Sequence, residues 1–173
     1  ILYPVDLFLS NYLKKSNTHA FGEYSVWNDL IEGNINSEIV IYGSSRAWVG
    51  INPNLIGKEL NKKVYNLGID GHNFWLQYLR HQILLKYNKK PKHIIVSIDP
   101  FTFERREDLY NKDQFLPYLL YNNNFHQSLK PYKGYLTTYY YIPCLRFIGR
   151  TKAVNAAFGS LIKPNTNEAG RVN

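Results

Sequence analysis

The sequence predicts an α/β protein built on a parallel, doubly wound sheet. Three short stretches are typical of strands, namely residues 38–42, 63–67 and 93–98. Segments with helical signals separate them, and such strand–helix–strand connections are right-handed and give parallel strands. The third stretch is apolar at successive positions, which indicates a strand covered by helices on both faces.

Two helices are predicted before the first strand. Residues 5–13 carry apolar side chains at helical spacing, which predicts a short amphipathic helix. Residues 16–21 form a polar connector, and a second helix is expected over 23–31, ended by Gly33.

Two more helices are predicted between the strands. Asn52 and Pro53 open the first, because proline is favoured at the first position of a helix, and it is expected to end near Leu60. We expect Asn73 to cap the second helix, which runs through Tyr87. Its predicted buried stripe consists of Leu76, Leu79, Ile83 and Tyr87.

The chain is predicted to become helical after the third strand, which ends at Asp99 and Pro100. No further strand is expected, and four helical stretches are predicted: 113–121, 125–130, 134–142 and 145–161. The predicted organisation is an N-terminal helical lead-in, a parallel α/β core, a helical insertion and a polar loop that leads elsewhere: residues 1–36, 37–102, 103–162 and 163–173.

The composition favours a globular domain, and its net positive charge is the main feature that bears on function. With 173 residues, 45% hydrophobic and 20% charged, the chain is long enough for a core and too apolar to be disordered. A net charge of +8 is compatible with a nucleic acid or an anionic cell envelope as partner. The Lys and Arg residues are spread along the chain, so we interpret them as a solvated basic face and predict no nucleic-acid partner.

Disulfides and metal sites have little support in the sequence. Cys144 is the only cysteine, which excludes an internal disulfide and a cysteine-based metal site. The five histidines show no metal-ligand spacing, and no cofactor is predicted. The first residues are apolar but interrupted by Pro4 and Asp6, too short to span a bilayer. We expect a membrane anchor or signal upstream of them.

The stretch that follows the first strand is the strongest candidate for chemistry. Gly43 lets the backbone turn sharply, so that Ser44 and Ser45 project from the carboxyl end of the strand. Ligands of open α/β sheets bind at that end. Two interpretations remain open: one serine is a nucleophile, or both serines cap the segment that follows.

Other polar residues follow the ends of the neighbouring strands. Asp70, Gly71 and His72 come after the second strand, and Asp99 comes after the third. Because the carboxyl ends of parallel strands share one edge, Ser44, Ser45, Arg46, Asp70, Gly71, His72 and Asp99 are expected to meet there. Arg46 either binds an anionic substrate or pairs with an acidic neighbour.

With these residues in view, the chain resembles the SGNH (GDSL-like) hydrolase superfamily, and most of all its cell-envelope branch of acyl-transfer proteins. Gly43-Ser44-Ser45-Arg46 is similar to the first block of the family, and Asn66-Leu67-Gly68-Ile69-Asp70-Gly71 is similar to the second. The resemblance covers about residues 37–102. It implies a flavodoxin-like three-layer fold with Ser45 as nucleophile and Gly71 in the oxyanion hole. The implied activity is that of a serine esterase or O-acyltransferase on glycans outside the cytoplasm.

The sequence departs from the family in two places. Where the third block offers an asparagine, this chain has Asp99, and an ionised carboxylate would repel an oxyanion. The final Asp-x-x-His block, which supplies the base, has no counterpart here. We therefore expect an incomplete fragment that is inactive alone. The alternatives are a non-catalytic carbohydrate-binding or scaffold module of the same fold, and a basic nucleic-acid-binding domain.

The histidines are predicted to leave Ser45 without a base. His81 should face solvent, His93 should lie at the amino end of its strand, and nothing orients His19. No carboxylate is spaced in the sequence to orient His126 as a base. His72 is the exception, because it directly follows Gly71 at the predicted sheet edge.

Overall fold

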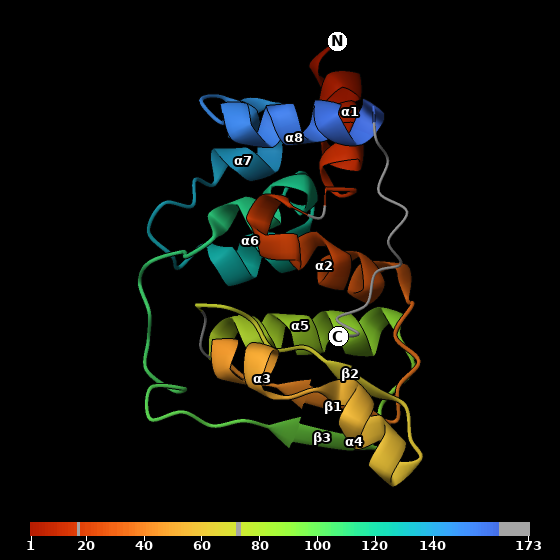
Figure 1. The fold of residues 1–173 in the computed structure, drawn as a ribbon. Helices are drawn as coiled ribbons and strands as arrows, with labels where there is room; N and C mark the ends of the chain where they lie inside the picture. The colour runs from red at the N-terminus through yellow and green to blue at the C-terminus, as the bar shows by residue number, and fades with distance from the viewer. Residues whose placement is uncertain (17, 72–73, 163–173) are drawn as a thin grey trace. The chain divides into compact units, whose positions relative to one another are not determined.

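A computed structural model describes residues 1–16, 18–71 and 74–162 of the chain. His72, Asn73 and the predicted loop at 163–173 lie outside the described residues, so the predictions made for them stay open. The described chain forms two compact units. We call residues 26–106 the sheet unit, and residues 1–25 with 107–162 the helical unit (Figure 1).

The sheet unit contains three parallel strands, which confirms the predicted α/β class. The strands are β1 (Ile39–Tyr42), β2 (Val64–Asn66) and β3 (His93–Val96), and their order in the sheet is β2-β1-β3. In this register Ile41 lies between Asn66 of β2 and Ile95 of β3. The three carboxyl ends therefore lie at one edge of the sheet.

Four helices belong wholly or largely to this unit, namely α2 (Glu23–Glu32), α3 (Ser45–Gly50), α4 (Pro53–Leu60) and α5 (Phe74–Tyr87). In Figure 1, α5 lies over the strands while α3 and α4 lie in front of them. The Asn52 side chain accepts hydrogen bonds from the amides of Asn54 and Leu55, which confirms the predicted start of α4. The sequence did not predict α3, because six residues are too few to show a helical period.

Helix α2 is joined to α5 by polar and aromatic contacts. The Arg80 guanidinium lies 4.8 Å from the centre of the Trp27 ring, and both side chains are fully buried. Beyond the end of α5, the Asn88 side chain donates to the Leu30 carbonyl at 2.6 Å and accepts from the Ile35 amide at 2.8 Å. These contacts fix the segment that leads into β1.

The prediction that helices cover both faces of β3 is wrong. All four residues of the strand are exposed, with Ile94 at 48% and both Ile95 and Val96 at 40%. The strand pairs only with β1 in the described part of the chain, so its other edge has no partner strand there. Its apolar pattern matched a covered strand, but among the described residues the packing against β3 leaves all four of its side chains exposed.

The helical unit is built from short helices and 3-10 turns. They are α1 (Leu2–Leu13), η1 (His19–Gly22), η2 (Lys112–Tyr118), α6 (Asn123–Leu129), α7 (Thr138–Tyr141), η3 (Leu145–Phe147) and α8 (Thr151–Ile162). The helix predicted over 145–161 is broken at Gly149, whose φ is +74°. Apart from an isolated bridge between Asp108 and Lys133, the described residues of this unit contain no strand pairing.

A fully buried ion pair lies in the core of the helical unit. The Arg146 guanidinium donates to both carboxylate oxygens of Asp6 at 2.7 Å, and each side chain is 1% exposed. Arg146 also donates to the Ser10 hydroxyl at 2.9 Å and to the Leu116 carbonyl at 2.5 Å. Helix α1 also packs against α8. Over the described ranges, no helix has the length and apolar character needed to cross a bilayer.

Candidate functional site

The turn after β1 has room only for glycine. A Cβ atom on Gly43 would lie 2.5 Å from the Ala47 Cβ and 2.9 Å from the Ser97 Cβ. The chain therefore turns directly from the strand into α3, with Ser44 as its N-cap residue and Ser45 as its first residue. This confirms the predicted role of the glycine.

The two serines have different environments. The Ser44 hydroxyl is buried, donates to Oδ2 of Asp99 and accepts from the Arg46 amide at 3.3 Å. The capping interpretation is therefore correct for Ser44. Ser45 is half-exposed, and its hydroxyl makes no hydrogen bond within the residues that the structure describes. Of the two, Ser45 is the more accessible to solvent.

Asp99 is a buried carboxylate held by a short network. It is 4% exposed, and Nη1 of Arg46 donates to its Oδ1 at 2.8 Å. Its own amide donates to the Thr102 hydroxyl at 2.7 Å. Arg46 therefore pairs with an acidic neighbour, the second of the two predicted roles.

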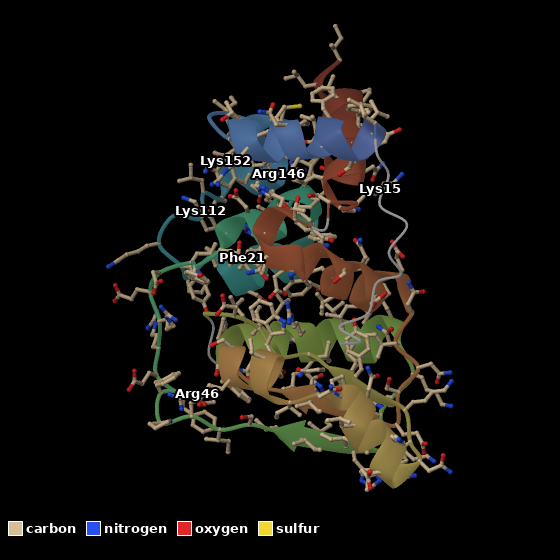
Figure 2. The ribbon with its side chains drawn as sticks, viewed as in Figure 1. Lys15, Phe21, Arg46, Lys112, Arg146 and Lys152 are labelled. Atoms are coloured by element: carbon tan, nitrogen blue, oxygen red, sulfur yellow. The ribbon has the colours of Figure 1, made fainter. Side chains whose placement is uncertain are left out.

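Arg46 itself lies on the surface (Figure 2), with 64% of its side chain exposed and its guanidinium 5.3 Å from the centre of the Phe101 ring. It offsets the charge of the carboxylate from the solvent side.

The loop after β2 runs beside this turn. The Leu67 amide donates to the Ile41 carbonyl at 2.7 Å, and the Ile69 amide donates to the Gly43 carbonyl at 3.0 Å. The loop therefore carries Asp70 and Gly71 to the edge where β1 ends. Gly71 adopts a left-handed conformation, with φ of +69°, and its carbonyl accepts a hydrogen bond from Arg106.

Asn66 fixes the far end of α3. Its buried side chain donates to the carbonyls of Ala47 and Ile51 at 2.8 and 2.9 Å, and it accepts from the Gly68 amide at 2.9 Å. The first helix turn that presents Ser45 is thus anchored at both ends, by Ser44 and by Asn66. The sequence pointed to Asn66 only as part of a resembling block.

The structure thus brings Ser44, Arg46 and Asp99 into direct contact, and it places Ser45, Asp70 and Gly71 at the same sheet edge. None of the four described histidines is hydrogen-bonded to Ser45. Instead, His19 pairs with Asp113, His81 with Tyr42 and His126 with Tyr135. His93 begins β3, at the amino end of the sheet, as expected.

No protein-family model matches the chain, and no curated protein or solved structure gives a significant match. The likeness to SGNH hydrolases therefore stays a prediction that depends on two short blocks.

The prediction that His81 faces solvent is wrong. Its ring is half-buried, and Nδ1 lies 3.0 Å from the Tyr42 hydroxyl. Burial lowers the pKa of His81, so the imidazole is neutral at physiological pH. With Tyr42 it lines an apolar pocket of about 240 Å³ whose other walls are Phe74, Gln77, Tyr78, Ile94 and Val96. No local signal marks this pocket, because strands and helix meet there only after folding.

Proposed function

We propose that the chain carries the nucleophile-bearing part of a serine esterase or O-acyltransferase of the SGNH type, acting on ester groups of cell-envelope glycans. The observation that carries the proposal is the contrast between the two serines. Ser44 is engaged by Asp99, whereas Ser45 opens α3 at the carboxyl edge with a hydroxyl that has no hydrogen bond to any described residue. The strand order β2-β1-β3 is also the order of the first three strands in flavodoxin-like sheets.

The proposed reaction begins with attack of the Ser45 oxygen on an ester carbonyl. The hydroxyl proton passes to a base, and the amides of Ser45 and Gly71 donate to the oxyanion that forms. Collapse of this intermediate releases the alcohol, which takes up the proton and leaves an acyl group on Ser45. Water then gives hydrolysis, or a second hydroxyl gives acyl transfer.

The proposal requires a base that the described residues do not supply. The described histidines have other partners or lie at the amino end of the sheet. His72 follows Gly71 in the sequence and lies outside the described residues. A base-bearing block elsewhere in the natural protein is the other source, in keeping with the resemblance.

The glycan substrate and the compartment outside the cytoplasm are supported by the resemblance alone. The runner-up function is a non-catalytic carbohydrate-binding or scaffold module of the same fold. It shares the sheet edge and differs in having no activated serine.

A fluorophosphonate probe separates these functions when it is applied to the longest natural form of the protein. We expect labelling of Ser45, identified by mass spectrometry, and loss of that label in Ser45→Ala. Ser44→Ala should keep the label on Ser45, and His72→Ala shows whether that histidine is the base. Absence of label from the folded natural protein would favour the non-catalytic module.

A further inference from the structure

The helical unit contains an open pocket of about 730 Å³ that shares no residue with the sheet-edge site. It is lined by residues 18–21 and 108–113 together with Lys133 and Lys152. All of these belong to the helical unit. A pocket of several hundred Å³ is large enough to hold a small molecule.

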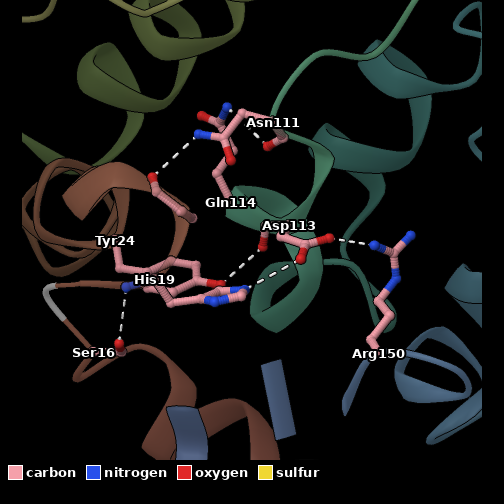
Figure 3. A network of polar contacts seen from close by, with 8 residues as sticks. Ser16, His19, Tyr24, Asn111, Asp113, Gln114 and Arg150 are labelled. Atoms are coloured by element: carbon pink, nitrogen blue, oxygen red, sulfur yellow. Dashed lines mark hydrogen bonds and ion pairs between the residues drawn. The ribbon is translucent and has the colours of Figure 1, made fainter. Parts of the chain in front are cut away.

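Two left-handed turns shape its wall. Ala20 and Phe21 have φ of +53° and +56°, a conformation that side chains with a Cβ rarely adopt, and Asn111 opposite them has φ of +45°. The Asn111 side chain donates to the Ala20 carbonyl at 3.1 Å and so links the two turns (Figure 3). Strained backbone of this kind gathers at ligand sites, where it holds the wall in one shape.

The acid in this wall is already neutralised. His19 Nε2 lies 3.2 Å from Oδ2 of Asp113, and Arg150 forms an ion pair with Oδ1. The Tyr24 hydroxyl donates to the Asp113 carbonyl at 2.9 Å, which positions the residue (Figure 3). Burial alone would raise the pKa of Asp113, but the hydrogen bond from His19 and the charge of Arg150 lower it below its usual value. Asp113 is therefore ionised and paired.

Two lysines in the wall form no close ion pair, although the charge of Lys112 also contributes to the lowered pKa of Asp113. Lys112 and Lys152 form no ion pair or hydrogen bond within the described ranges, whereas Lys133 pairs with Glu107. Figure 2 shows Lys112, Lys152 and Phe21 on the same side of the unit. Asp108 is the remaining carboxylate of the lining, and its backbone forms an isolated bridge to Lys133. With three lysines and two aspartates, the lining carries a net positive charge, and the lysines outside ion pairs come from η2 and α8.

We propose that this pocket binds a small phosphate monoester whose organic part contains a ring, that is, a sugar phosphate or a nucleotide. Two separate ammonium groups suit a phosphate dianion, because each lysine acts as a point charge and the two together match its double negative charge. Phe21 is 61% exposed and Tyr110 is 40% exposed, so aromatic surface is available for a ring at the pocket margin.

Isothermal titration calorimetry at low ionic strength tests the ligand class. The probes are glucose 6-phosphate, adenosine 5′-monophosphate, inorganic phosphate and glucose. We expect at least one ester to bind at least about tenfold more tightly than inorganic phosphate and than glucose, and the preferred ester identifies the organic part. Binding of neither ester overturns the proposal, and glucose binding as tightly as its phosphate does so as well. If inorganic phosphate binds as tightly as the esters, the claim that the pocket recognises a ring is wrong.

Variants locate the site. The double variant Lys112→Ala/Lys152→Ala should weaken ester binding at least about tenfold, and Phe21→Ala should weaken the ester while sparing inorganic phosphate. The matched control is Lys58→Ala/Lys89→Ala, which removes two exposed lysines of the sheet unit and should change nothing. Circular dichroism verifies that each variant is folded. Equal affinity of the wild type and the Lys112/Lys152 variant overturns the proposed location.

Discussion

The Arg146–Asp6 pair of the helical unit and the Arg46–Asp99 pair of the sheet unit both join distant segments, and the two pairs differ in exposure. Arg146 and Asp6 in the helical unit are each 1% exposed, and the guanidinium holds both carboxylate oxygens. Arg46 and Asp99 in the sheet unit are 64% and 4% exposed, with a single direct contact. The first pair is closed to solvent, while the second leaves its arginine on the surface.

This difference separates a structural pair from one that remains open to a ligand. Removal of one partner of a closed pair leaves an uncompensated charge in the core. In the open pair, water reaches the guanidinium and screens the loss. The Arg46 guanidinium is therefore accessible to solvent, as the proposed function requires of a group near its site, whereas Arg146 holds α1 to the rest of its unit.

The largest effect is expected from Asp6→Ala. It leaves Arg146 buried without its carboxylate, so the helical unit should lose about 3–5 kcal/mol of unfolding free energy. Urea denaturation followed by far-UV circular dichroism measures this loss. Trp27, Trp48 and Trp75 all lie in the sheet unit, so tryptophan fluorescence reports on that unit separately.

The double variant Asp6→Leu/Arg146→Met is the control, because it removes both charges and should recover most of the lost stability. A loss below about 1 kcal/mol in Asp6→Ala, the value typical of an exposed pair, would break the comparison.

Gly43→Ala should have the next largest effect. Its new methyl group would meet the Ala47 and Ser97 Cβ atoms at 2.5 and 2.9 Å, so we expect the sheet unit to lose about 1–3 kcal/mol. Tryptophan fluorescence during urea unfolding measures it. Gly50→Ala is the matched control, since nothing lies within 4 Å of its added Cβ, and it should change stability by less than about 0.5 kcal/mol. Equal losses in the two variants would show that the turn is not tight.

The two serines should differ in stability as well as in reactivity. Ser44→Ala removes the N-cap of α3 and a partner of buried Asp99, for an expected loss of about 1–2 kcal/mol. Ser45→Ala should stay within about 0.5 kcal/mol of the wild type, because its hydroxyl has no partner among the described residues. Thermal unfolding of both variants measures the difference. A larger loss in Ser45→Ala would assign the structural role to the other serine.

The smallest effect concerns pH, and it has opposite signs in the two units. The pKa of Asp113 is lowered in the folded state, so its ionised carboxylate stabilises the helical unit. This stabilisation is fully present above the unfolded pKa of about 3.9. It is lost as the pH falls through the folded pKa. Burial raises the pKa of Asp29 despite the hydrogen bond from Tyr65, so the sheet unit gains stability at this residue as the pH falls through the raised pKa.

Urea midpoints between pH 7 and pH 3 measure both trends. Asp113→Asn should flatten the acid loss of the helical unit, and Asp29→Asn should remove the acid gain of the sheet unit. A variant whose pH profile matches that of the wild type would contradict the role given to its carboxyl group.

Local signals predicted most of the sheet unit. The β-branched run at Ile39–Tyr42 and the Asn52-Pro53 start of α4 each have a physical cause within a few residues, and both predictions are confirmed. The polar residues of the sheet edge were also predicted, because parallel strands share their carboxyl ends. The exposure of β3 was not predictable, because an apolar pattern shows that a strand favours burial but does not show which element, if any, packs against it.

Contacts between distant residues were not predictable from the sequence. His19 meets Asp113 across 94 positions, and no pattern in either segment announces the other. Ala20 and Phe21 adopt left-handed conformations without the Gly or Asn that usually marks them. The pocket of the helical unit could therefore not be predicted from the sequence. The same is true of the contact between His81 and Tyr42.

The division of the chain has a consequence for the order in which the protein forms. Residues 26–106 are continuous and can fold as soon as they leave the ribosome, whereas the helical unit joins two segments that flank them. Helix α1 packs against α8, which is the last of the described elements to be synthesised. At bacterial or eukaryotic synthesis rates, α1 waits on the order of ten seconds for its partner, with the Asp6 carboxylate still in water. Because Arg146 follows Asp6 by 140 positions, the ion pair that buries this carboxylate can form only after that long loop has been synthesised.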